Sequence, residues 1–208
     1  GGIGKAFSTA EQARVNVSSG NTGNTRFAVN AISTSGEVTN TTVTVTSAYG
    51  KRIASSTTNR LDDAALRAAV ETSERLARLS PEDPEYLGEL GPMAVPERNA
   101  VVESTATLPP EGRSAAIGRV TAPAAQKELI ATGFLVHNTG SAAVMTAKGP
   151  FAYEAPTSAN FPTTVRTADG SGSGWAGTGF FDWNSLNTAE LAQAAIDKAE
   201  RSRQPRAV

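Results

Sequence analysis

The sequence predicts an α+β protein: an antiparallel β-meander packed with a long helix, followed by a helical linker region and a second, mostly antiparallel sheet with a C-terminal helix. Two patterns favour this class. Valine and threonine alternate within residues 37–49, as they do in a half-buried strand. Apolar residues then recur at helical spacing within residues 62–79. With 39% hydrophobic and 19% charged residues, the 208-residue chain has the composition of a globular protein.

The meander is expected to contain four strands, at residues 14–18, 25–33, 37–49 and 52–57. In the second strand, Phe27, Val29 and Ala31 would share one face. In the third, Val43 and Val45 alternate with threonines, which is typical of a strand with one buried face. Strands this short, separated by turns such as the one expected at residues 49–51, are expected to pair antiparallel.

A helix is predicted over residues 62–79. Its apolar stripe comprises Leu66, Ala69, Val70, Ser73, Leu76 and Ala77. Asn59 or Asp62 can cap the free N–H groups at its start, and Ser80-Pro81 ends it. This helix is expected to cover one face of the meander, so that residues 1–80 form a first unit with its own core.

A proline-rich linker is predicted over residues 81–110, which contain six prolines. A second α+β unit, residues 111–208, is expected to follow. It would begin with a helix over residues 111–131 that Pro123 breaks or kinks. Three strands should come next, at residues 135–138, 142–147 and 162–167, with a turn at Gly149-Pro150.

A glycine-rich stretch, residues 169–179, is expected to be a loop between strands, and its glycines to serve turns and close backbone approach. Asn187 should then cap a last helix that runs to about residue 203, with Glu190 placed for a capping-box contact. Because the apolar face of this helix is mostly alanine, we expect it to pack closely on its neighbour.

No residue in the chain can be assigned to catalysis or to a metal. There is no cysteine and only one histidine, whereas a zinc site normally takes three or four Cys, His or carboxylate ligands. The histidine, His137, is expected to be structural or at the surface. A serine nucleophile elbow between a strand and a helix is not found, and the Asp62-Asp63 pair is explained by helix capping.

Four aromatic residues of the second unit are candidates for contact with a partner or a peptide: Phe151, Tyr153, Trp175 and Trp183. Aromatic side chains dominate the energetics of such contacts, although ordinary packing in the core and at sheet edges explains them too. An exposed strand edge in this region could accept a peptide as an added strand.

The overall charge excludes a basic protein. The formal net charge is −1, so a nucleic-acid partner is not expected. No run of 18 apolar residues is present, and residues 1–10 lack the apolar core of a signal peptide, so neither a membrane span nor secretion is expected. Together with the lack of cysteine, this favours the cytoplasm.

Several segments resemble the TldD/PmbA family, whose members are paired metallopeptidase subunits also known as modulators of DNA gyrase. Residues 26–32 resemble the family's Arg-Phe-Ala-x-Asn segment, and residues 50–63 resemble its strand-to-helix junction. The other matching segments are residues 79–85, 147–149 and 169–175, with Thr157. Through their order and spacing the match spans most of residues 13–205.

The resemblance implies a non-catalytic N-terminal half of such a peptidase or of its inactive partner subunit, contributing scaffold, dimerisation and peptide binding. In the catalytic subunits a His-Glu-x-x-x-His helix in the C-terminal half holds the metal, and that motif does not occur here. Zinc is therefore expected only in a C-terminal domain that this chain lacks. The family's usual helix before the first strand is also missing, so we expect a fragment of a homo- or heterodimer subunit.

Two other functions stay open on the sequence alone. The chain could be a stand-alone module that binds a protein or a glycan through its glycine- and aromatic-rich second sheet. It could also be a modulator associated with gyrase or DNA, in which case its DNA binding should depend on salt.

Overall fold

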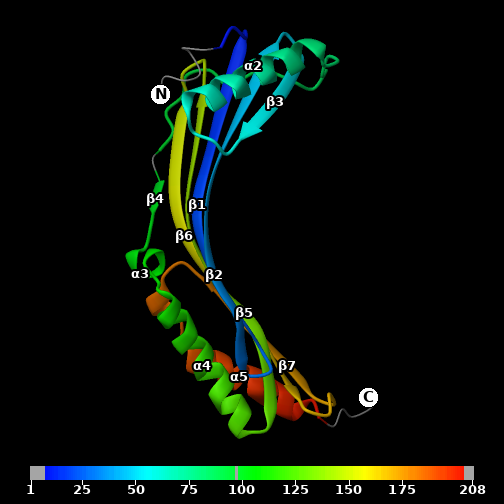
Figure 1. Cartoon of the computed structure of the whole chain (residues 1–208), viewed down its shortest axis with the longest axis vertical. Helices are drawn as coiled ribbons and strands as arrows, with labels where there is room; N and C mark the ends of the chain where they lie inside the picture. The colour runs from blue at the N-terminus through cyan, green and yellow to red at the C-terminus, as the bar shows by residue number, and fades with distance from the viewer. Residues whose placement is uncertain (1–7, 97, 204–208) are drawn as a thin grey trace. The chain divides into compact units, whose positions relative to one another are not determined.

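The computed structural model describes residues 8–96 and 98–203 (Figure 1). The strands are β1 (Gln12–Ala28), β2 (Ala31–Tyr49), β3 (Arg52–Thr58), β4 (Arg98–Ala100), β5 (Leu129–Thr146), β6 (Phe151–Thr167) and β7 (Ser173–Phe180). The helices are α2 (Asp63–Leu79), α3 (Glu103–Ala106), α4 (Pro110–Gln126), α5 (Thr188–Arg201) and the short 3-10 helix η1 (Trp183–Ser185). These elements confirm the α+β class.

One sheet of seven strands is found in the described part of the chain, in the order β3-β2-β1-β5-β6-β4, with β7 also paired to β6. β2 and β3 pair antiparallel, as do β6 and β7. The second sheet expected after residue 111 is therefore a continuation of the first, because β5 pairs with β1.

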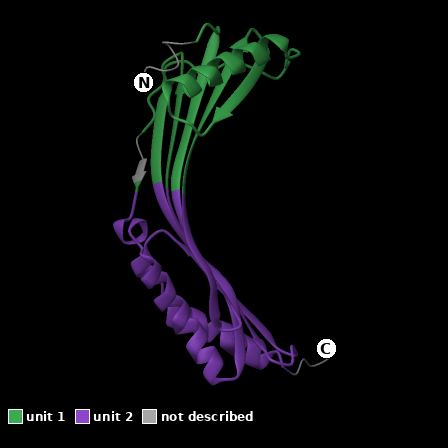
Figure 2. Ribbon diagram, viewed as in Figure 1, with its two compact units in different colours: residues 1–20, 39–100, 140–155 green, residues 21–38, 101–139, 156–208 purple. Residues whose placement is uncertain are grey.

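Contacts divide the chain into two compact units (Figure 2). Unit 1 consists of residues 1–20, 39–100 and 140–155, and unit 2 consists of residues 21–38, 101–139 and 156–208. Strands β1, β2, β5 and β6 each contribute residues to both units. The domain boundaries predicted at residues 80 and 110 stay a prediction.

In unit 1, α2 packs on the meander through its apolar stripe. The core there comprises Val15, Val43, Val45, Leu66, Ala69 and Val70. Of the two predicted caps, Asp62 is the one used, since its carboxylate accepts a hydrogen bond from the N–H of Ala65 at 3.0 Å. One expected member of the stripe is not buried: Leu76 is 40% exposed, whereas Glu74 is buried.

The buried carboxylate of Glu74 joins α2 to the residues that precede β1. It accepts hydrogen bonds from the hydroxyl of Ser8 at 2.9 Å and from the N–H and hydroxyl of Thr9 at 2.6 and 2.7 Å. Burial by itself raises the pKa of Glu74, but these hydrogen bonds outweigh burial and hold the pKa below its usual value.

In unit 2, α4 and α5 contribute to the larger core. Its largest fully buried apolar side chains are Phe27, Ile117, Leu129, Leu135, Phe161 and Ile196. The rings of Phe27 and Phe161 meet edge to face, with centroids 6.2 Å apart. Pro123 lies inside α4 but does not divide it. The helix runs unbroken over residues 110–126.

The prediction of a single strand over residues 25–33 is wrong, because the chain turns within this segment. Val29 and Asn30 have positive φ angles of 51° and 61° and separate β1 from β2. Val29 is accordingly 70% exposed instead of sharing a buried face with Phe27. Asn30 tolerates this conformation, and its side chain fixes the turn to β5 by accepting from the N–H of Ala131 at 2.7 Å and donating to the carbonyl of Leu129 at 2.8 Å.

The helix predicted to continue to residue 131 ends at Gln126. Glu128 adopts a positive φ of 55°, and Leu129 and Ala131 are then buried as the first residues of β5. The two short strands predicted at residues 135–138 and 142–147 are parts of this single strand, which ends at Thr146 and whose neighbours β1 and β6 supply hydrogen-bonding partners along it.

The glycine-rich stretch is partly a strand, β7, and not a loop throughout. Its glycines nonetheless serve close backbone approach, as predicted. A Cβ atom on Gly174 would lie 2.1 Å from the carbonyl oxygen of Ala195, and one on Gly172 would lie 2.4 Å from that of Ala199. The alanine-rich face of α5 therefore packs directly on β7, and Asn187 caps this helix by accepting from the N–H of Glu190.

Candidate functional site

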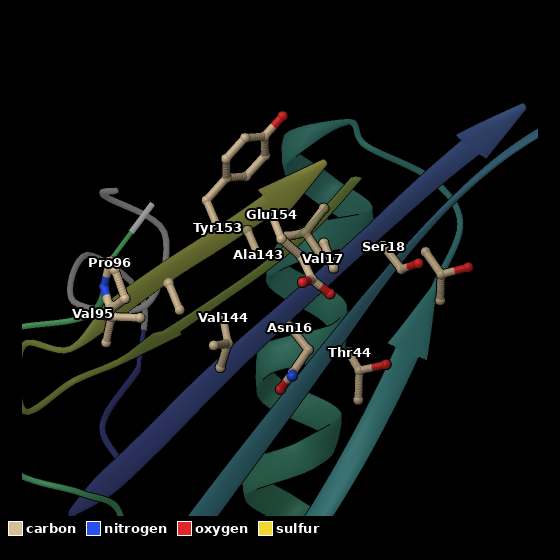
Figure 3. Close-up of a pocket in the computed structure, with 13 residues that line it drawn as sticks. Asn16, Val17, Ser18, Thr44, Val95, Pro96, Ala143, Val144, Tyr153 and Glu154 are labelled. Atoms are coloured by element: carbon tan, nitrogen blue, oxygen red, sulfur yellow. The ribbon is translucent and has the colours of Figure 1, made fainter. Parts of the chain in front are cut away.

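A cavity of about 410 Å³ lies in unit 1, against strands β1, β2, β5 and β6 (Figure 3). Its lining is mostly apolar or small. The lining residues are Asn16, Val17, Ser18, Thr42, Thr44, Val95, Pro96, Ala142, Ala143, Val144, Ala152, Tyr153 and Glu154. A cavity of this size and composition suits one apolar or aromatic side chain with a few polar groups around it.

Strand alternation explains why this part of the sheet carries a cavity. Successive side chains of a strand point to opposite faces, and Val43 and Val45 are buried in the core with α2. Thr42 and Thr44 alternate with them and line the cavity instead. The same alternation that the sequence showed thus separates a covered face from an open one.

The described lining of the cavity carries few ionisable groups. Among the described residues that line it, Glu154 carries a carboxylate and Tyr153 a phenol, and none is a histidine, lysine or arginine. These described lining residues therefore do not pair a general base with a general acid of another type. Within residues 8–96 and 98–203, no group of three or more His, Cys, Asp and Glu side chains could hold a metal ion.

The four aromatic contact candidates are divided between the two units. Tyr153 lines the cavity of unit 1 and is 41% exposed, and Phe151, two residues earlier on β6, is 52% exposed. Trp175, in unit 2, is 57% exposed. Trp183 is half-buried and packs against Phe180, with ring centroids 6.1 Å apart. Their role in contacts with a partner or peptide stays a prediction.

A second cavity, of about 500 Å³, lies in unit 2 between β7 and α5. Trp175 and the five residues that follow it form one wall, Ser185 to Asn187 lie at one end, and the α5 wall comprises Glu190, Leu191, Ala194 and Lys198. The glycine-rich strand and the last helix were both singled out from the sequence, but the cavity between them was not, because it depends on how β7 pairs.

Sequence reasoning missed a buried polar centre in unit 2. The guanidinium of Arg113, on α4, is fully buried and donates hydrogen bonds to Thr25 Oγ1 at 3.0 Å and to Nε2 of His137 at 2.9 Å. His137 Nδ1 in turn donates to the carbonyl oxygen of Thr105 at 3.1 Å. These contacts require the neutral imidazole with its proton on Nδ1. Glu37 supplies the counter-charge, 3.1 Å from Arg113 Nη1.

The electrostatics of this centre indicate a structural role. Burial disfavours the charged form of His137, and Arg113 repels it, so the pKa of His137 lies below its usual value. Of the two expectations for His137, structural or at the surface, the structure excludes the surface, because the imidazole is buried with a hydrogen-bonding partner at each ring nitrogen. A nearby Gly23 makes room for the pair, since a Cβ atom there would lie 2.1 Å from His137 Nε2. The sequence offered no signal for these partners, which lie on different elements.

No helix in the described ranges is both long and apolar enough to cross a membrane.

Comparison with known proteins identifies the first part of the chain. Residues 13–77 match a family model described as PmbA/TldA metallopeptidase domain 1. No curated protein matches the sequence.

Solved structures with a similar fold cover nearly the whole chain. TldE from Thermococcus kodakarensis superimposes with a TM-score of 0.79 at 12% identity, covering 92% of this chain and 44% of that protein. A protein from Thermotoga maritima described as a modulator of a DNA gyrase gives 0.79 at 13% identity, covering 91% and 44%. A protein from Bacteroides thetaiotaomicron with a similar description gives 0.75 at 15% identity, covering 92% and 46%.

The chain spans less than half the length of these solved proteins. Residues 13–77 are thus similar to the first domain of PmbA/TldA metallopeptidases, and the fold of the chain is consistent with the N-terminal half of TldD/PmbA-type proteins.

Proposed function

We propose that the chain serves as the non-catalytic N-terminal half of a TldD/PmbA-type metallopeptidase or of its inactive partner subunit. It would provide scaffold, a subunit contact and a docking surface for peptides, while bond cleavage belongs to a zinc site on other residues. The observation that supports this proposal is the cavity of unit 1, whose described lining is mostly apolar or small and offers a pocket for a side chain.

Peptide is the ligand class that fits this cavity best. Its apolar and small lining residues can surround an apolar or aromatic side chain, and Tyr153 adds a rigid amphipathic surface at low entropic cost. Asn16, Thr42 and Thr44 offer hydrogen-bonding groups for a main chain that crosses the open face. The family description, a metallopeptidase domain, supports the same ligand class.

Binding can be tested on the 208-residue chain with fluorescein-labelled, unstructured decapeptides that carry either phenylalanine or serine at the centre. The phenylalanine peptide should bind more tightly. Tyr153→Ala should weaken its binding by about tenfold, because the substitution removes a large contact surface. Leu87→Ala is the matched control, since Leu87 is 95% exposed and lies outside the cavity, and it should leave binding unchanged. Equal binding of both peptides would contradict the proposal.

The non-catalytic part of the proposal has its own test. The purified chain, incubated with Zn²⁺ and then passed through a desalting column, should retain no stoichiometric zinc. It should also leave the same decapeptides uncleaved. Stoichiometric zinc, or hydrolysis that a chelator abolishes, would place the catalytic site in these residues and refute the assignment.

A second candidate function is a stand-alone module that binds a protein or a glycan, which the exposed rings of Tyr153 and Trp175 favour. Sedimentation analysis separates the two functions. A subunit should form a dimer with a second copy of the chain or with a TldD/PmbA partner. A stand-alone module should remain a monomer and should not bind a TldD/PmbA partner.

A further inference from the structure

Main-chain atoms form part of the lining of the second cavity. In unit 2, six consecutive residues of β7 line this cavity of about 500 Å³, which lies against α5. Gly177 and Gly179 are among them, and because glycine has no side chain, the atoms that these two residues bring to the lining belong to the backbone. A small molecule in the cavity would therefore meet peptide groups directly.

The hydrogen bonds of β7 show which peptide groups point away from β6. On α5, Lys198 donates from Nζ to the carbonyl oxygen of Trp175 at 2.9 Å, so this carbonyl is directed outward. The direction repeats at every second residue of an antiparallel strand, so Gly177 and Gly179 also direct their N–H and carbonyl groups outward. The register agrees, because Pro162 lies opposite Gly177 and has no N–H to donate to it.

Two of these outward groups form a matched pair of an acceptor and a donor. In the described part of the chain, neither the carbonyl of Gly177 nor the N–H of Gly179 has a hydrogen-bonding partner, whereas the carbonyl of Gly179 receives a long contact of 3.5 Å from Thr178 Oγ1. The two groups without partners follow each other along the same side of the strand. A ligand that satisfies both must present a donor beside an acceptor.

We propose that this cavity binds a nucleoside whose base is adenine. Adenine carries an exocyclic amino donor beside a ring-nitrogen acceptor, a pattern that an amide recognises with one carbonyl and one N–H. Here the carbonyl of Gly177 accepts from the amino group, and the N–H of Gly179 donates to the ring nitrogen. The site goes beyond the proposed function, because it takes a small molecule in unit 2 and needs nothing from the cavity of unit 1.

The size and the apolar walls of the cavity suit the base. A volume of about 500 Å³ lies within the range of small-molecule sites. Leu186, Leu191 and Ala194 contribute apolar side chains to the lining. Sites of this kind combine apolar walls, which bury the faces of a ligand, with a few backbone N–H and carbonyl groups that fix its orientation.

Glu190 supplies a carboxylate for the sugar. On β7, Gly172 lies against the carbonyl of Ala199, and two residues later Gly174 lies against that of Ala195, so α5 runs antiparallel to the strand. At about 1.5 Å per helical residue and about 3.3 Å per strand residue, Glu190 comes alongside the middle of β7. Glu190 also lines the cavity, and a carboxylate is a suitable acceptor for ribose hydroxyl groups.

The charges of the lining favour a ligand without phosphate. Among the described residues that line the cavity, Lys198 is the cation, and its Nζ already donates to the carbonyl of Trp175. A phosphate joined to the ribose would instead be repelled by the carboxylate of Glu190. Adenosine is therefore expected to bind more tightly than adenosine 5′-monophosphate.

Isothermal titration calorimetry of the 208-residue chain with adenosine and with purine riboside tests the recognition of the base. Purine riboside keeps the shape and the ring nitrogens of adenosine but lacks the amino group, so it leaves the carbonyl of Gly177 unpaired and should bind about tenfold more weakly or worse. Equal binding of the two nucleosides, or no binding of adenosine, would overturn the site. Tighter binding of adenosine 5′-monophosphate would overturn the unphosphorylated nucleoside as its occupant.

Two substitutions of Gly179 test the donor. Gly179→Pro removes the outward N–H at no cost in hydrogen bonds to β6 and should weaken adenosine binding by about tenfold or more. A Cβ atom on Gly179 would meet nothing closer than 3.9 Å, so Gly179→Ala keeps the N–H without crowding and should bind within about twofold of the unsubstituted chain.

Amide hydrogen exchange in the unsubstituted chain gives a readout that needs no variant. Saturating adenosine should slow exchange of the Gly179 amide by at least about tenfold, because the N–H becomes hydrogen-bonded to the base. Adenosine binding without protection of this amide, or equal affinities of the proline and alanine variants, would overturn the site while leaving peptide docking in unit 1 intact.

Discussion

The buried guanidinium of Arg113 depends on the absence of a side chain at residue 23. We predict that Gly23→Ala lowers the free energy of unfolding by about 3 kcal/mol, because the new methyl group would overlap His137 Nε2 and Arg113 Nη1 and force apart two buried polar groups. Urea denaturation followed by circular dichroism measures the change.

Gly36→Ala is the matched control for this substitution. Gly36 also lies on a strand of unit 2, but a Cβ atom there would meet nothing within 4 Å, so the change should stay within about 0.5 kcal/mol. A similar decrease in the free energy of unfolding in both variants would show that any added methyl group on these strands destabilises the protein. The polar centre at Arg113 and His137 would then not explain the effect of Gly23→Ala.

His137 should make stability depend on pH. Its folded-state pKa lies below the ordinary 6.5, so the unfolded chain binds the proton first and stability falls as pH drops below 6.5. The slope contributed by His137 is at most about 1.4 kcal/mol per pH unit. Denaturation of the unsubstituted chain and of His137→Gln between about pH 5 and pH 7 checks this, since the slope should flatten in the variant.

The groups around His137 do not reverse this sign. Burial and the neighbouring Arg113 guanidinium lower the pKa of His137, and together they outweigh the Thr105 carbonyl and the charge of Glu37, which raise it. An unchanged slope in His137→Gln would mean that folding does not shift the pKa of the histidine, which would contradict this account. A structural position for His137 was one of the two predictions, because a single histidine without cysteines is a poor basis for a zinc site, but its partners are 24 or more residues away in the sequence.

At the scale of the elements, α5 packs closely against β7 at Gly174. We predict that Gly174→Ala destabilises the protein by about 2–3 kcal/mol, because the methyl group would lie 2.1 Å from a backbone carbonyl of α5 that cannot rotate away. Thermal unfolding measures the effect. Gly179→Ala, on the same strand with free space, should leave the melting temperature nearly unchanged, and an equal loss there would contradict this account.

Helices and strands differed in how far the sequence determined them. The 3.6-residue period and a capping aspartate placed α2 to within one residue, because both signals are local. The middle of β1 is rich in Ser, Gly, Asn and Thr, which favour turns, so a gap was predicted between residues 18 and 25. It is extended because β2 and β5 pair with β1 on its two sides.

The glycines of β7 led to the wrong prediction of a loop, again because strand pairing overrides local preference. Glycine has little intrinsic preference for a strand, yet β6 supplies a ladder from Ala159 to Arg166 that holds the segment extended. What could be predicted was the use of glycine for close approach, since the alanine-rich face of the following helix indicated a tight partner. The backbone segment that the glycines approach could not be predicted, because it depends on pairing between segments that are distant in the sequence.

At the scale of the whole molecule, the net charge of −1 gives a prediction against the DNA-associated function. The 208-residue chain should pass through immobilised double-stranded DNA in about 50 mM salt without retention, because it offers no excess of cations to replace counterions. Affinity chromatography with a basic DNA-binding protein as positive control makes the measurement. Retention that disappears as salt rises would revive the gyrase-associated alternative.

The candidate cavity could be predicted only in part. Tyr153 was singled out as an aromatic contact residue, and the alternation at residues 42–45 indicated one buried and one open face. The cavity itself is made by residues from positions 16 to 154, brought together by strand order and by the segment at Val95 and Pro96. Neither strand order nor that segment's path has a local signature in the sequence.

Four strands are shared between the cores of unit 1 and unit 2, and each core is assembled from three separate stretches of polypeptide. No single scission of the chain, by a protease or by the choice of a gene boundary, can therefore release one core intact. A cut in the proline-rich stretch would place β1 and β5, which pair with each other, on different fragments. The chain crosses between the two units five times, so transfer of one unit alone to an unrelated protein would require every one of these backbone connections to be remade.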